Sequence, residues 1–228
     1  MSTEMKQQIP KTLAGFTWYK QSAFRWKGDS RVIYIDPWGL QGDLPEADLI
    51  LITHAHEDHF VPADIKKVQG RKTTILAPAD VAKELSGNVK TVKPGEGHDA
   101  AGIKIETVPA YNIVEGRTEN HPKRNNWVGY LMALDGQTYY HAGDTDNLPE
   151  LQRLRTNVAF VPIGGGGFTM DVGEAATLVK AMKPQLAVPM HFGFFPGAGR
   201  ASDGKRFEQE AKPVAVTILT PVERFATP

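Results

Sequence analysis

One short segment of this chain concentrates residues that bind metal ions. It is Thr53-His54-Ala55-His56-Glu57-Asp58-His59, and it directly follows the continuous apolar run Leu49–Ile52. Such a run is typical of a strand buried on both faces, and ligands commonly bind at the carboxyl ends of these strands. Imidazole and carboxylate groups are ligands for zinc, iron and manganese. The segment therefore predicts a metal site at a strand end.

The spacing within this segment divides its side chains into two sets. His54 and His56 are two residues apart, so in an extended segment both point to one side. Asp58 and His59 follow where the chain must turn before the next helix, and they can face a second point. The alternative is a polar loop with surface histidines. That alternative requires the pattern His-x-His-x-Asp-His to arise by chance, which a chain of this composition would do roughly once in three thousand sequences.

The composition restricts the chemistry of this centre. The chain has 228 residues with seven histidines and no cysteine, so the ligands must be nitrogen and oxygen, and cysteine nucleophiles are excluded. Its 26 basic and 26 acidic residues give a formal net charge of zero. This argues against nucleic-acid binding, because proteins that bind nucleic acids usually carry a surplus of basic residues. No apolar run reaches the about 18 residues of a membrane span, and Met1–Phe16 lacks a secretory signal. We expect a cytoplasmic protein with a small-molecule partner.

Strands and helices in alternation must position these residues. We expect strands at Phe16–Tyr19, Ser22–Arg25, Arg31–Ile35, Leu49–Ile52, Thr73–Ala77, Val89–Val92, Ile103–Val108, Trp127–Leu134, Thr138–His141, Val158–Pro162, Leu186–Pro189 and Val214–Leu219. We expect helices at Pro62–Val68, Ala79–Leu85, Val172–Met182 and Asp203–Ala211, and a further one capped by Asn147. The mixture favours an α/β sandwich, in a single domain over residues 1–228 whose residues 1–15 are loosely ordered.

Several segments resemble the metallo-β-lactamase-fold hydrolases. Besides residues 53–59, they are Tyr34-Ile35-Asp36-Pro37, Tyr140-His141-Ala142-Gly143-Asp144-Thr145 and Val188-Pro189-Met190-His191. The chain is most similar to the small stand-alone metal-dependent hydrolases that include ascorbate-6-phosphate lactonase-like proteins, through Gln21-Ser22-Ala23-Phe24, Gly143-Asp144-Thr145, Phe168-Thr169-Met170-Asp171 and Pro189-Met190-His191. The resemblance implies an αββα sandwich of two mixed β-sheets with helices outside.

The same resemblance implies one or two divalent metal ions per chain. The ligands would be His54 and His56 at the first site, Asp58, His59 and His191 at the second, and Asp144 as a bridge. The family usually supplies a third histidine to the first site after the strand Ile103–Val108, where this chain has Pro109-Ala110-Tyr111-Asn112. His121, in the long loop Tyr111–Asn126, is the preferred replacement, and Asn112 and His98 are the alternatives.

Three other features have structural explanations that compete with functional ones. His141 either supports Asp144 or is a satisfied core histidine. Gly164–Gly167 lacks the Lys-Ser/Thr ending of a phosphate loop, so a turn beside the site is the better interpretation. The four tryptophans either line the rim of a pocket or pack in the core, and core packing is the better expectation for most of them: Trp18, Trp26, Trp38 and Trp127.

The expected reaction is hydrolysis. Zinc, with manganese and iron as alternatives, would lower the pKa of bound water toward about 7, and a second ion about 3.5–4 Å away would polarise the substrate's carbonyl or phosphoryl oxygen. Asp58 would orient the hydroxide and relay a proton, and Asp144 would hold the metals. Developing charge would be stabilised by Tyr111, Asn112 or Lys123.

The resemblance favours a small ester, lactone or phosphorylated metabolite as substrate. One alternative is phosphodiester cleavage of the nuclease type, against which the zero net charge stands. Another is a metal-binding or sensing protein without turnover, because the first site lacks a histidine. A homo-oligomer is compatible with the sequence, which does not specify one.

Overall fold

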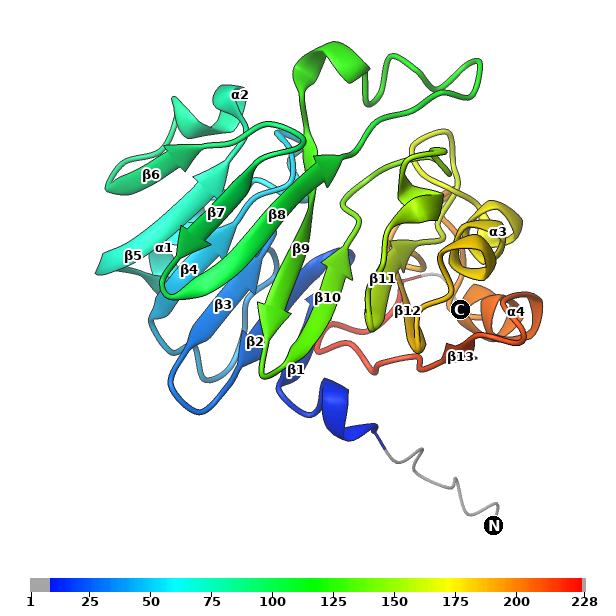
Figure 1. The fold of residues 1–228 in the computed structure, drawn as a ribbon, viewed down its shortest axis with the longest axis horizontal. Helices are drawn as coiled ribbons and strands as arrows, with labels where there is room; N and C mark the ends of the chain where they lie inside the picture. The colour runs from blue at the N-terminus through cyan, green and yellow to red at the C-terminus, as the bar shows by residue number, and fades with distance from the viewer. Residues whose placement is uncertain (1–8, 227–228) are drawn as a thin grey trace.

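Two β-sheets packed face to face make up the core of the protein (Figure 1). The computed structural model describes residues 9–226. The first sheet has the order β1-β2-β3-β4-β5-β6 and the second the order β13-β12-β11-β10-β9-β8-β7. Because both sheets are mixed and helices lie outside them, the expected αββα sandwich is confirmed.

Each sheet combines an antiparallel part with a parallel part. In the first, β1, β2 and β3 are antiparallel and β3 to β6 are parallel. Its strands are β1 (Phe16–Lys20), β2 (Ala23–Lys27), β3 (Val32–Ile35), β4 (Ala47–Leu51), β5 (Gln69–Ala77) and β6 (Asn88–Thr91). In the second, β7 to β10 are antiparallel and β10 to β13 are parallel. Its strands are β7 (Gly97–Ala100), β8 (Ile103–Pro109), β9 (Val128–Leu134), β10 (Gln137–His141), β11 (Val158–Pro162), β12 (Leu186–Met190) and β13 (Ala215–Val216).

The strand β4 shows why these sequences form central strands. Leu49 and Leu51 point into the core between the sheets, whereas Ile50 and Ile52 pack with Ile65 of α1 on the other face. Both faces are therefore buried, as the unbroken apolar run indicates. The helices are α1 (Pro62–Val68), α2 (Ala79–Ala82), α3 (Val172–Met182) and α4 (Asp203–Glu210), with 3-10 turns at Lys11–Leu13, Lys123–Asn125 and Leu151–Arg153.

The helix α3 begins and ends where the sequence predicts. Asp171 and Glu174 form a reciprocal capping box, in which the backbone N–H of Glu174 donates to Asp171 and that of Asp171 donates to Glu174, both at 2.9 Å. Lys183 ends the helix in the left-handed conformation. Figure 1 shows α3 and α4 side by side against β11–β13.

The helix expected after Asn147 is wrong, because only the 3-10 turn Leu151–Arg153 is present there. The chain before it, residues 142–146, is buried and is held by contacts to the loop that follows β8, such as the hydrogen bond from the backbone N–H of Asp146 to the Tyr111 carbonyl. The sequence also missed the polar edge strand β7, and the last strand is reduced to Ala215–Val216.

The expectation of a loosely ordered N-terminus covers residues 1–15, of which 1–8 lie outside the described residues. Within the remainder, Leu13 ends a 3-10 turn and is buried in the core. Over residues 9–226, none of the helices combines the length and the hydrophobicity that crossing a bilayer requires.

Candidate metal centre

Histidine and aspartate side chains from four strand ends meet at one edge of the sandwich. β4 leads into residues 53–59, β10 into Asp144 and β12 into His191. The fourth contribution is His121, from the loop between β8 and β9, which rises above this edge in Figure 1. The parallel strands β4, β10 and β12 thus deliver their following residues to one place, as open α/β sheets generally do.

His54, His56 and His121 form the first cluster. One nitrogen of each lies within 4.8 Å of the others, and the ring centroids of His54 and His56 lie 5.0 and 4.7 Å from that of His121. Trp127 packs against all three rings, at 5.0 to 5.6 Å, and its indole N–H donates to Asp80 at 2.7 Å. The structure therefore brings His121 to the position where the sequence lacks a histidine.

Asn112 orients His121. The amide nitrogen of Asn112 donates to Asp146 and to the carbonyl of Phe168, both at 3.0 Å, so its oxygen is free to accept. That oxygen lies 2.8 Å from Nδ1 of His121, and an amide oxygen can only accept. Nδ1 of His121 therefore carries the proton, and the lone pair of Nε2 faces the other histidines.

Asp36 orients the rings that follow β4. Its carboxylate accepts from the backbone N–H and the hydroxyl of Thr53 at 2.8 and 2.7 Å, and from Nδ1 of His59 at 2.7 Å. Because the Thr53 hydroxyl donates to Asp36, it accepts from Nδ1 of His54 at 2.9 Å. These Nδ1 contacts thus direct Nε2 of His54 and of His59 toward the other candidate ligands, the orientation that suits a metal ligand.

Asp58, His59 and His191 form the second cluster. An oxygen of Asp58 lies 3.6 Å from Nε2 of His59 and 3.4 Å from Nε2 of His191. Asp144 lies between the two clusters, with its oxygens 3.0 Å from Nε2 of His191, 3.4 Å from that of His59 and 3.5 Å from that of His121. This is the placement that a bridging carboxylate requires.

The donor set fits divalent metal ions. Within the described residues, Nε2 of His54, His59 and His121 and Oδ1 of Asp144 are buried without a hydrogen-bond partner, although buried polar atoms are nearly always paired. Two ligands at 2.0–2.1 Å from one tetrahedral ion are about 3.3 Å apart, and the distances around Asp144 are of this size. Nitrogen and oxygen donors together suit zinc, manganese and iron.

Burial and neighbouring charges separate the pKa values of the histidines. Burial, with His59 nearby, holds the pKa of His54 well below its ordinary value, and burial lowers that of His56 to about 4. Burial also acts to lower the pKa values of His59 and His191, but the carboxylates led by Asp144 outweigh it. They raise the pKa of His59 well above its usual range and that of His191 to about 9.

The carboxylates respond to the same charges. Burial would raise the pKa of Asp144, but His191 and His59 hold it well below its usual range. Burial likewise opposes ionisation of Asp58, whose pKa is nevertheless lowered by His59 and His191. Both aspartates are therefore ionised at neutral pH, as metal ligands must be.

The cluster opens into a cavity of about 730 Å³. Asp58, Asp144 and His191 lie at its base, and Trp38, Phe168 and Phe195 are among its lining residues. Gly166 also lines it, so the Gly164–Gly167 segment is a turn beside the site. The sequence analysis gave Trp38 as a candidate for a pocket rim but missed Phe168 and Phe195, although all three lie in loops that follow parallel strands, the same signal that identified the ligands.

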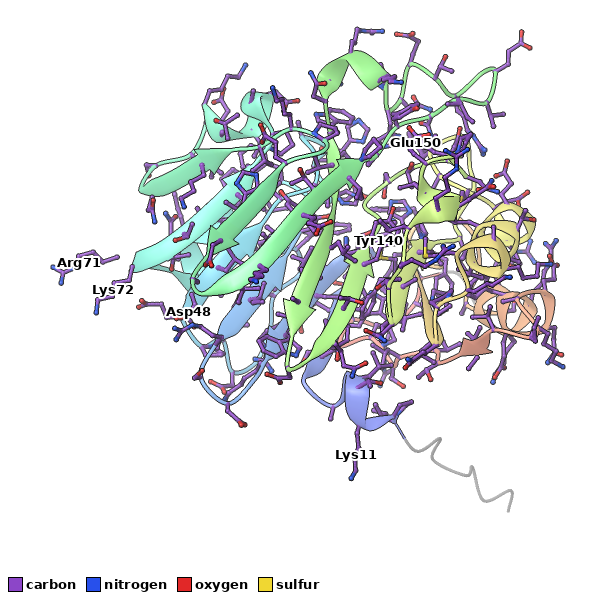
Figure 2. All side chains as sticks on the ribbon, viewed as in Figure 1. Lys11, Asp48, Arg71, Lys72, Tyr140 and Glu150 are labelled. Carbon is purple, nitrogen blue, oxygen red and sulfur yellow. The ribbon has the colours of Figure 1, made fainter. Side chains whose placement is uncertain are left out.

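Two of the three residues expected to contact substrate lie elsewhere. Tyr111 and Lys123 line a separate surface hollow of about 410 Å³, where the Tyr111 hydroxyl donates to Glu150 at 2.8 Å (Glu150 is labelled in Figure 2) and Lys123 lies over the Tyr111 ring. The third, Asn112, is buried and bound to His121 and Asp146. The structure gives these residues supporting contacts, which sequence spacing alone did not indicate.

The two remaining histidines lie outside both clusters. His141 is buried with Nε2 3.0 Å from the Ser22 carbonyl, and its Nδ1 accepts from the N–H of Gly143 at 3.3 Å. It is thus a satisfied core histidine that also holds the residue before Asp144. His98 lies on β7 beside Glu96.

Comparisons with known proteins agree with this geometry. Residues 15–191 match the family described as the beta-lactamase superfamily domain. A UPF0173 metal-dependent hydrolase of Pyrococcus abyssi is 35% identical over 90% of this chain and 95% of its own. A crystal structure of a candidate metal-dependent hydrolase from Parabacteroides distasonis is 33% identical with a TM-score of 0.79, covering 89% of this chain and 91% of its own. A metallo hydrolase from Ignicoccus hospitalis is 27% identical with a TM-score of 0.75, over 91% and 95%.

Proposed function

This chain belongs to the beta-lactamase superfamily and to its metal-dependent hydrolases, and we propose that it hydrolyses a small ester, lactone or phosphorylated metabolite. The observation that carries the proposal is the position of Asp144, whose oxygens face Nε2 atoms of both histidine clusters. The proposed ligands are His54, His56 and His121 for one ion and Asp58, His59 and His191 for another, with Asp144 between them.

The chemistry divides between the ions and the carboxylates. When bound, a divalent ion lowers the pKa of a water molecule and polarises a carbonyl or phosphoryl oxygen. Asp58 is the proposed proton acceptor, because its side chain is 17% exposed and lines the cavity, whereas that of Asp144 is 3% exposed. Asp58 would take a proton from the attacking water and return it to the leaving group, and Asp144 would hold the ions.

Zinc is the proposed metal, and manganese and iron are the alternatives because all three accept imidazole and carboxylate ligands. A cytoplasmic location and a homo-oligomeric state remain predictions, which cell fractionation and light scattering would test. Phosphodiester cleavage and metal binding without turnover are the competing functions, and the experiment below distinguishes them.

The test is turnover by metal-loaded protein. Protein stripped of metal and reloaded with Zn²⁺, Mn²⁺ or Fe²⁺ should hydrolyse phenyl acetate, γ-butyrolactone or phenyl phosphate. The Asp58→Ala variant should hydrolyse them at least a hundredfold more slowly and should bind less metal. Its circular dichroism spectrum should be unchanged, which would show that it still folds. Asp99→Ala, an exposed aspartate on β7, is the matched control. Turnover of bis(4-nitrophenyl) phosphate alone would favour the phosphodiesterase, and metal uptake without any turnover would favour the sensing protein.

A further inference from the structure

The cavity above the candidate metal centre has an aromatic entrance. Trp38 follows β3, Phe168 follows β11 and Phe195 follows β12, and all three line the cavity. The rings of Trp38 and Phe195 stack, with centroids 5.5 Å apart and planes 16° apart. Two different sheets thus contribute to one apolar surface beside Asp58 and His191.

Phe168 and Phe195 are exposed although hydrophobic packing would favour burying them, whereas Trp38 is half-buried against the hydrophobic cluster that includes Ile50. Phe168 is 45% exposed and Phe195 is 37% exposed. Scattered exposed apolar residues need no explanation, but several that line one concave site indicate a ligand surface. They line the same cavity as Asp58, Asp144 and His191, so the remainder of a substrate bound at these residues would lie against them.

The walls of the cavity are preformed. A side chain at Gly164 would collide with the carbonyl of His191, and one at Gly166 would collide with the carbonyl of Gly197, so the two loops pack backbone against backbone. The Phe195 loop is closed by hydrogen bonds from Gly193 N–H to the Ala198 carbonyl and from Ala198 N–H to the Phe195 carbonyl, both at 3.1 Å. An apolar group can therefore bind without the cost of ordering these loops.

The cavity offers no cation to a substrate anion that lies away from the metal ligands. Apart from the candidate ligand His191, its charged lining residues are Glu57, Asp58 and Asp144, and none of the described lining residues is Lys or Arg. Lys20 lies 4.1 Å from the Trp38 ring centroid but is paired with Glu223 at 2.6 Å. A distal phosphate or carboxylate would lose its hydration and gain no ion pair.

We propose that the substrate is an uncharged ester or lactone whose apolar, preferably aromatic, substituent lies against Trp38, Phe168 and Phe195. This inference rests on the proposed hydrolase function and narrows its substrate class, because it removes metabolites with a distal phosphate. The scissile carbonyl would lie at the base of the cavity, beside Asp58, and the substituent would extend toward the entrance.

Four methyl esters test the proposal on the metal-loaded enzyme: the acetate, the butanoate, the 3-phenylpropanoate and the hydrogen succinate. The value of kcat/KM should rise about fourfold for each added methylene, the ratio that corresponds to burying one CH₂. The hydrogen succinate, similar in length to the butanoate but anionic, should react at least tenfold more slowly than it. Trp38→Ala and Phe195→Ala should lower kcat/KM for the 3-phenylpropanoate about tenfold and for the acetate less than twofold. Val222→Ala, which removes an apolar side chain that is 46% exposed and does not line the cavity, should change neither.

Binding of the neutral amide 3-phenylpropanamide, measured by calorimetry, tests the same surface without turnover. Trp38→Ala and Phe195→Ala should bind it at least fivefold more weakly than wild type and Val222→Ala. Absence of turnover with every ester and lactone would refute the proposed function, while the amide would still test the surface. Equal binding by all variants, or faster turnover of the hydrogen succinate than of the butanoate, would overturn the inference.

Discussion

Replacing Asn112 by alanine tests how the chain compensates for its missing histidine. His121 is fully buried, and its Nδ1–H donates to the Asn112 oxygen at 2.8 Å. The variant removes this acceptor and also the donor to Asp146 and to the Phe168 carbonyl. The variant would then lack the hydrogen bond that fixes the proton on Nδ1 and directs Nε2 toward the first cluster, while the packing of Trp127 on the ring would remain.

Two magnitudes follow from these contacts. Loss of a residue that orients a metal-bound histidine lowers metal affinity about 10–100-fold, which corresponds to roughly 1.4–2.7 kcal/mol. A buried N–H without a partner also destabilises the metal-free protein by about 1–3 kcal/mol. Because the first effect requires metal and the second does not, the two can be measured separately.

The assay is Zn²⁺ competition with a chromophoric chelator, combined with urea unfolding of the metal-free protein. Asn112→Ala should retain both ions and bind one of them at least tenfold more weakly, whereas His121→Ala should lose that ion. Asn120→Ala is the matched control, because Asn120 lies in the same loop and its side-chain amide donates to the carbonyl of Gly167 at 2.6 Å. It should change the affinity less than twofold.

Two results would refute parts of the reasoning. Unchanged Zn²⁺ binding by both Asn112→Ala and His121→Ala would mean that His121 is not a ligand. If His121→Ala loses an ion but Asn112→Ala binds both with wild-type affinity, His121 is a ligand but does not depend on Asn112 for its orientation. A change confined to urea stability would assign Asn112 a structural role only.

Three further predictions concern the metal ions. Asp36→Asn keeps the shape of a side chain that accepts from Thr53 and His59 but loses one accepting oxygen, so Zn²⁺ affinity should fall at least tenfold; competition assays giving wild-type affinity would contradict this. Removing metal with a chelator, from a free Zn²⁺ concentration of a hundred times Kd, should cost about 2.7 kcal/mol and lower Tm by roughly 5–10 °C, which calorimetry would measure. Zn²⁺ affinity should decrease at least tenfold from pH 8 to pH 6, since imidazoles must be unprotonated to coordinate, and a flat profile at constant ionic strength would argue against histidine ligands.

Local patterns were sufficient for most of the fold. The apolar run before Thr53 and the Asp171–Glu174 capping pattern depend on neighbours in the sequence, and both structures form as expected. The helix expected after Asn147 fails for the opposite reason. Its propensity is overridden by distant contacts, in which the carboxylate of Asp146 accepts from the backbone of Ile113 and Val114 at 2.7 and 2.9 Å and the segment is drawn into the site.

The candidate ligands were found because strand ends concentrate them, whereas the residues that orient them follow no period. Asn112 was considered for contact with substrate or metal, yet its amide bonds to residues 9, 34 and 56 positions away. Arg117 extends this network by pairing with Asp146 at 2.8 Å and Glu174 at 2.7 Å, so the loop that carries His121 is fixed to the start of α3. Such contacts depend on the packing of two sheets and cannot be derived from spacing along one segment.

The aromatic cavity wall is different, because the rule that located the ligands also applies to it. Ligand sites lie outside the carboxyl ends of parallel strands, and the residues there include Trp38 two positions after Asp36 and Phe195 four positions after His191. Core packing was the default expectation for tryptophan because burial is the usual fate of a large apolar side chain. Trp38 meets both expectations, because it is partly buried against the hydrophobic cluster that includes Ile50 and also lines the cavity. An aromatic residue within a few positions of a candidate ligand, or of the carboxylate that orients one, is therefore a candidate for the cavity lining, and the ester series with Trp38→Ala and Phe195→Ala is also a test of that rule.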